Sequence, residues 1–79
     1  MKTLTVYAAQ IQGYHHIGIS ADKTEAIKLI VAKVYPACEF VYAEQLRIDS
    51  GVYNVRVKGT HLTYIVPVFV TDHEVSFDE

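Results

Sequence analysis

The chain has 79 residues, of which 51% are hydrophobic and 20% are charged, and its formal net charge is −2 at pH 7. This length predicts a single domain over residues 1–79, small enough that association with another chain would help to stabilise it. The mild acidity excludes a general basic field that would attract nucleic acid or anionic membranes. One cysteine, Cys38, excludes an internal disulfide, and the N-terminus lacks the apolar run of a signal peptide, so we expect a cytoplasmic protein.

The first part of the chain predicts one or two strands and a helix. Residues 3–11 are rich in β-branched and aromatic types, which favours a strand, and a weaker strand pattern follows over residues 14–20. The apolar period then becomes helical, which predicts a helix over residues 22–35. Asp22 is expected to cap its first turn and Pro36 to end it. The expected buried stripe of this helix comprises Ala26, Ile27, Ile30, Val31 and Val34.

The second part of the chain predicts a three-stranded antiparallel meander. Apolar and polar residues alternate over residues 39–49 and 52–58, and a third strand covers residues 62–70. Together with the first part, this predicts an α+β two-layer domain: an antiparallel sheet of four or five strands packed against one helix, in the order β-(β)-α-β-β-β.

Short turns would fix the register of the meander. A two-residue loop at Ser50-Gly51 would pair Leu46 with Val55, and a two-residue loop at Gly59-Thr60 would pair Val55 with Tyr64. In this register the side of the meander that faces the helix carries Phe40, Tyr42, Leu46, Ile48, Tyr53, Val55, Val57, Leu62, Tyr64 and Val66.

The strand over residues 62–70 is apolar at both alternating sets of positions, which indicates that both of its sides are covered. The helix accounts for one side, and a partner chain is expected on the other. An open alternative is that the N-terminal hairpin, or a tail from Asp72 to Glu79, covers Ile65 and Phe69. The expected partner-binding residues are Arg47, Asn54, Arg56, Ile65 and Phe69, with Asp72 and Glu74 of the acidic tail as a second contact.

Residues that could carry chemistry are few. An enzyme using His15 or His16, with His61 and His73 as conceivable companions, would require a concave pocket. Adjacent histidines on a strand point to opposite faces, so no metal site is predicted. Cys38 follows the end of the helix, where the helix dipole disfavours an activated thiolate. We therefore expect a non-enzymatic protein without a cofactor.

A short, mildly acidic chain with N-terminal strands, one central helix opening on Ala21-Asp22-Lys23-Thr24-Glu25-Ala26-Ile27-Lys28, and a following meander resembles several small phage-encoded anti-CRISPR proteins. The resemblance implies an inhibitor that occupies a nucleic-acid or subunit surface on a bacterial CRISPR effector complex, in the host cytoplasm. It carries no motif, so no residue role follows from it.

The leading expectation is therefore a protein-interaction module whose partner is a CRISPR effector subunit, with a homodimer as another option and no membrane association. Two alternatives remain open. One is a ligand-binding homo-oligomer that resembles dodecin. The other is a small nucleic-acid-binding sheet domain that uses Arg47, Arg56 and Lys58 beside Phe69, although Asp49 offsets this charge and direct nucleic-acid binding is not expected.

Overall fold

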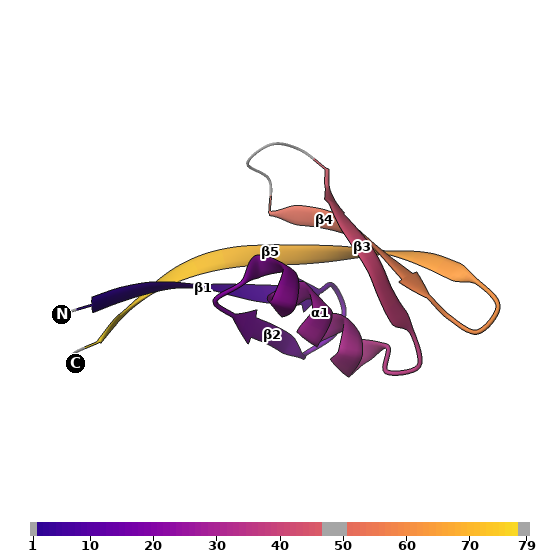
Figure 1. Cartoon of the computed structure of the whole chain (residues 1–79), viewed down its shortest axis with the longest axis horizontal. Coiled ribbons are helices and arrows are strands. Elements are labelled where there is room, and N and C mark those ends of the chain that lie inside the picture. The colour runs from indigo at the N-terminus through magenta and orange to yellow at the C-terminus, as the bar shows by residue number, and fades with distance from the viewer. Residues whose placement is uncertain (1, 47–50, 78–79) are drawn as a thin grey trace.

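The computed structural model describes residues 2–46 and 51–77 (Figure 1). Within these residues the chain forms β1 (Lys2–Ile11), β2 (Ile17–Ser20), α1 (Lys23–Val34), β3 (Glu39–Gln45), β4 (Val52–Lys58) and β5 (Thr63–Phe77). The strands make one antiparallel sheet in the order β2-β1-β5-β4-β3, and α1 packs on one side of it. The predicted α+β two-layer fold, with one helix and this element order, is confirmed.

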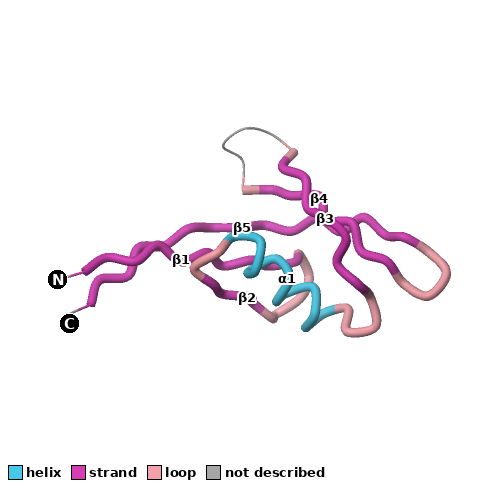
Figure 2. The backbone as a smooth tube through the Cα atoms, viewed as in Figure 1, coloured by secondary structure: helices cyan, strands magenta, loops and turns pink. Residues whose placement is uncertain are grey.

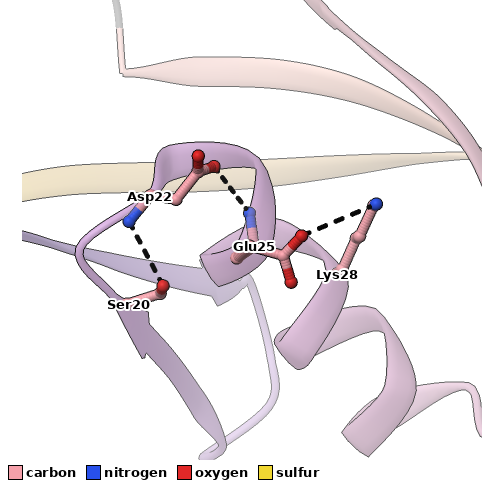
Figure 3. Close-up of polar contacts among 4 residues, drawn as sticks. All are labelled: Ser20, Asp22, Glu25 and Lys28. Atoms are coloured by element: carbon pink, nitrogen blue, oxygen red, sulfur yellow. Dashed lines mark hydrogen bonds and ion pairs between the residues drawn. The ribbon is translucent and has the colours of Figure 1, made fainter.

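The helix begins where its capping residue predicts. The Asp22 carboxylate accepts a hydrogen bond from the backbone N–H of Glu25 at 3.1 Å, and the Asp22 N–H donates to the Ser20 hydroxyl at 3.2 Å (Figure 3). The Glu25 carboxylate lies 3.7 Å from the Lys28 ammonium. One free amide of the first turn is thus satisfied by a side chain. The helix ends directly before Tyr35, as expected from Pro36.

The core lies between α1 and the sheet. Ala26, Ile27, Ile30 and Val31 are buried, as the helical stripe predicts, and Val34 is half-buried. Each large apolar side chain buried here contributes about 1.5–3 kcal/mol to folding. The sheet contributes Ala9, Ile11, Tyr53, Val55, Val57, Val66, Val68 and Val70 to the same cluster.

Strands β1 and β5 join the two halves of the chain. They pair along their whole common length, from Lys2 opposite Phe77 to Ile11 opposite Val68. The N-terminal hairpin therefore extends the sheet in its own plane and does not cover a face of it. The predicted acidic tail is also wrong in form, because the segment from Asp72 continues β5 as far as Phe77.

The predicted register between β3 and β4 is wrong. A bulge between Phe40 and Tyr42 reverses which side each later residue of β3 faces, and Ala43 rather than Leu46 pairs with Val55. Tyr42 and Leu46 are consequently exposed and face away from the helix, whereas Phe40 and Ala43 pack against the core.

The predicted register between β4 and β5 is off by two residues. Val55 pairs with Val66, not with Tyr64, because the loop spans residues 59–62 and is closed by a 2.8 Å hydrogen bond from the Gly59 N–H to the Leu62 carbonyl. A shift of two keeps every residue on its predicted side. Leu62 and Tyr64 are nevertheless exposed.

At one end of the molecule β1 and β5 continue beyond their other neighbours as a two-stranded ribbon, and both ends of the chain lie there (Figure 2). We call this ribbon the arm; it comprises residues 2–6 paired with residues 73–77. The radius of gyration is 13.5 Å, whereas a compact chain of this length is expected near 12 Å. The arm thus makes the molecule elongated.

Gly18 allows α1 to lie directly on β2. A Cβ at this position would overlap the Ala26 carbonyl oxygen and would come within 2.8 Å of the Ile30 amide nitrogen. Both atoms belong to the helix backbone, so relief requires the whole helix to shift.

We expect Gly18→Ala to lower the free energy of unfolding by about 1–3 kcal/mol, the usual cost of overpacking a core. Chemical denaturation followed by circular dichroism measures this. Gly13→Asn is the comparison for backbone strain alone: Gly13 lies in a turn at φ +89° with no atom within 4 Å of a built Cβ, so only the positive φ opposes this change, and asparagine adopts a positive φ more readily than most residues. Equal stability of Gly18→Ala and the wild type would contradict the close packing of α1 on β2.

Candidate interaction surface

The side of the sheet opposite α1, which we call the outer face, is apolar over most of its extent. Side chains alternate between the two faces of a strand, so the residues between the buried positions of β5 and β1 face outward, as do the neighbours of Gly18 in β2. The exposed large apolar residues of the outer face are Leu4, Ile17, Ile19, Tyr42, Leu46, Ile65, Phe69, Val75 and Phe77.

Four of the predicted partner-binding residues come together on the outer face. Arg56 pairs with Ile65 across β4 and β5, Asn54 lies one outward position along β4, and Phe69 lies two outward positions from Ile65 along β5. Ile65 is 58% exposed and Phe69 is 38% exposed. Neither the N-terminal hairpin nor the C-terminal segment lies over them, since both are strands of the same sheet. Arg47 lies outside the described residues, as does Ile48.

The two acidic residues predicted as a second contact lie on the other side of the sheet. Asp72 pairs with Tyr7 on the side of the helix, near the first residue of α1, Lys23. The pKa of Lys23 is raised, first by a hydrogen bond to Tyr53 and also by the nearby Asp72 charge. Glu74 faces the same way as Asp72, so neither carboxylate shares a surface with the outer face.

Basic groups border the apolar part of the outer face. The Arg56 guanidinium lies 5.3 Å from the centre of the Tyr42 ring, a cation–π contact that covers part of both side chains. Lys58 occupies the next outward position of β4 and Glu44 lies opposite Asn54. The outer face therefore has an apolar middle and a mixed polar rim on the β3–β4 side, which is typical of protein interfaces.

The arm belongs to this surface, and the sequence reading missed it. Its outward side carries Leu4, Val6, Val75 and Phe77 together with Lys2 and His73, while the opposite side carries only the polar residues Thr3, Thr5, Glu74 and Ser76. The signal was present in the sequence, since residues 72–77 have the same period of two as residues 3–6. The acidic residues of the segment suggested a solvated tail instead.

Both outermost strands of the sheet are protected against pairing with another strand. The Lys33 ammonium, from the last turn of α1, donates to the Ile17 carbonyl of β2 at 2.8 Å. On the opposite edge, β3 carries the bulge between Phe40 and Tyr42. Short strands, lysines and bulges are the usual means of preventing edge-to-edge association, so these edges are poor sites for strand addition.

A shallow apolar cleft of about 370 Å³ lies beyond the end of the helix. Its lining includes Tyr35, Cys38 and Tyr64. The rings of Tyr14 and Tyr35 meet edge to face with centroids 6.1 Å apart, and a hydrogen bond with Tyr14 is the main reason that the pKa of Tyr35 is raised. The cleft offers aromatic and aliphatic contacts rather than a constellation of acids, bases and nucleophiles.

The histidines do not form a site. His15 and His16 are exposed in the loop between β1 and β2, His61 is exposed in the loop between β4 and β5, and the His73 ring lies 2.9 Å from the Thr71 hydroxyl on β5. Over residues 2–46 and 51–77, no three His, Cys, Asp or Glu side chains lie together in a way that could hold a metal ion. Among the same residues, no helix is long and apolar enough to cross a membrane.

Comparison with known proteins gives no relative for this chain: no family model, no curated protein and no solved structure matches it.

Adjacent residues of β5 should respond very differently to the same substitution. Val66→Asp places a charge in the core and should lower the free energy of unfolding by roughly 3 kcal/mol or more. Ile65→Asp faces outward and should change it by about 1 kcal/mol or less when measured at low protein concentration. Denaturant titrations of both variants provide the measurement. If Ile65→Asp or Phe69→Ser unfolds the domain, the outer face belongs to the core and the assigned sides of β5 are reversed.

Proposed function

We propose that this chain is a non-enzymatic protein-interaction module that binds its partner through the outer face. The observation that carries the proposal is the set of exposed apolar side chains on the outward side of β5, namely Ile65, Phe69 and Val75, with Thr71 and His73 between the last two. Exposed apolar side chains gathered on one face are typical of protein interaction sites. Burying Ile65 or Phe69 against a partner would contribute on the order of 1.5–3 kcal/mol each if burial is complete.

The distribution of charge supports a protein partner over a nucleic acid. A nucleic-acid platform needs cations that track the phosphates beside aromatic rings on which bases stack. The described cations of the β4 side, Arg56 and Lys58, lie at the border of the apolar row, and the Arg56 guanidinium already lies over Tyr42. Phe69 is surrounded along β5 by Pro67 and Thr71 rather than by basic residues.

The resemblance to small phage-encoded anti-CRISPR proteins supports a finer proposal. In this proposal the chain acts in the cytoplasm of a bacterial host and inhibits a CRISPR effector complex by blocking one of its subunit or nucleic-acid surfaces. A binding mechanism of this kind needs no catalytic group. It requires only a rigid surface, and the sheet braced by α1 supplies one.

Affinity capture with matched baits tests the interaction proposal. Phe69→Ser combined with Arg56→Glu should abolish retention of any specific partner that the wild type binds, because both residues lie on the outer face. Glu74→Lys is the control: it changes charge on the opposite side of the sheet and should retain the partner. Retention should survive washing at high salt, since apolar contacts carry the binding. If Glu74→Lys alone abolishes retention of the partner, the binding site lies on the side of the sheet that carries Asp72 and Glu74, not on the outer face.

Phage plating on a bacterial strain with active CRISPR immunity tests the inhibitor proposal. Expression of the wild type should restore plating of the targeted phage, and the Phe69→Ser, Arg56→Glu variant should not, at equal protein level. A phage that the immune system does not target is the control for general effects on growth. If the wild type leaves immunity intact against each effector type tried, the inhibitor proposal is wrong, whereas the interaction proposal is judged by the capture experiment.

A further inference from the structure

We infer that the partner seated on the outer face is a second copy of this chain, with two sheets stacked face to face in a two-fold dimer. The inference rests on the proposed function, because it names the occupant of the same surface. A CRISPR effector subunit cannot occupy that surface at the same time, so in this dimer an effector would be met through other residues. In this symmetric dimer the arm of each copy lies over the body of the other, where the body is the part of the sheet in which β1 and β5 also pair with β2 and β4.

The outward side of the arm carries exposed apolar side chains that no described element covers. Its outward side carries Leu4, Val75 and Phe77, each more than 40% exposed, while its other side is made of hydroxyl groups and the Glu74 carboxylate. A two-stranded ribbon is at best marginally stable alone in water. Neither α1 nor any other described element lies over the outward side (Figure 2).

The body of the sheet also carries exposed apolar side chains on the outer face. Ile65 and Phe69 lie outward on the part of β5 that pairs with β4, and Ile19 lies outward on β2. The chain therefore holds two uncovered apolar regions, arm and body, on one continuous side. With a two-fold axis between two such faces, the arm of each copy covers the body of the other. One kind of contact then buries the exposed apolar residues of both regions.

In such a dimer the two copies of β5 run antiparallel to each other across the interface, and the order of residues along β5 is compatible with this arrangement. Its outward residues are Ile65, Pro67, Phe69, Thr71, His73, Val75 and Phe77. Thr71 is the middle residue of this row and lies beside Ala8 of β1, while bulky apolar residues stand at both ends of the row. At the same level the next residue across the sheet is Ile19 of β2, so a two-fold axis at Thr71 brings the two Ile19 side chains to the same level of the interface. The His73 ring already has the Thr71 hydroxyl as a hydrogen-bond partner at 2.9 Å. Two stacked sheets lie about 10 Å apart.

The area of the face is of the order that a dimer needs. The molecule measures 49 Å by 26 Å in its two longest dimensions, which limits one face to at most about 1,000 Å² because the arm is only two strands wide, compared with roughly 800 Å² per partner in a standard interface. Beside the body, Lys33 and the β3 bulge protect the outermost strands of the sheet, which leaves face stacking as the route for association there. In the arm, by contrast, β1 and β5 have no further described strand beside them.

Sedimentation equilibrium of the full chain at micromolar concentration tests the inference. The wild type should have twice the mass of one chain. Val75→Lys, on the outward side of the arm, should raise the dimer dissociation constant at least about 100-fold, because the change occurs twice in a symmetric interface. Ser76→Lys is the matched control on the other side of the same arm and should leave the dissociation constant within about threefold of the wild type.

A second substitution tests the body half of the contact. Ile65→Lys should weaken the dimer as strongly as Val75→Lys, and circular dichroism at low concentration should show that both variants stay folded. A wild type that remains monomeric overturns the inference, as does equal weakening by Val75→Lys and Ser76→Lys. If the wild type is monomeric but the Phe69→Ser, Arg56→Glu bait still loses a captured partner, the second copy is refuted while the proposed function stands. If the chain dimerises through other residues and outer-face variants retain every partner, both proposals fail.

Discussion

The pairing of β1 with β5 is the contact on which the rest of the structure depends. It joins residues 2–11 to residues 68–77 and makes one sheet from the β1–β2 hairpin and the β3–β4–β5 meander. Because these two units meet edge to edge, the sheet becomes wide, yet the described residues form only one helix to place on it. One layer of helix can cover one face. The outer face is therefore left exposed. The arm projects because β1 and β5 pair with each other beyond the ends of β2 and β4.

Features that depend on neighbouring residues were predictable from the sequence. The helix stripe and the Asp22 cap are local, and both were located correctly. The sides of β4 and β5 were also assigned correctly, because an error of two residues in the loop after Gly59 does not change which side a residue faces. The exposure of Ile65 and Phe69 followed from those sides, although the sequence alone left open whether another part of the chain covered them.

Features that depend on distant contacts or on a single inserted residue were not predictable. Alternation in residues 39–49 pointed Tyr42 and Leu46 toward the helix, but a bulge after Phe40 turns them outward. No residue type there signals a bulge. The strand character of residues 72–77 requires β1 as a neighbour, and sequence patterns do not reveal pairing across more than sixty positions. Local patterns alone therefore predict a solvated tail at these residues.

The late position of β5 in the chain has a consequence for biosynthesis. Residues 68–77 are synthesised well after β1, yet β1 can complete its pairing only with them. The N-terminal hairpin and α1 can form earlier, but the buried side chains of β4 have no complete core until β5 arrives. Contacts between the two ends of a chain form slowly because the loop between them must first be closed. The nascent protein thus passes through a stage with an open strand edge, when chaperone binding is of most use to it.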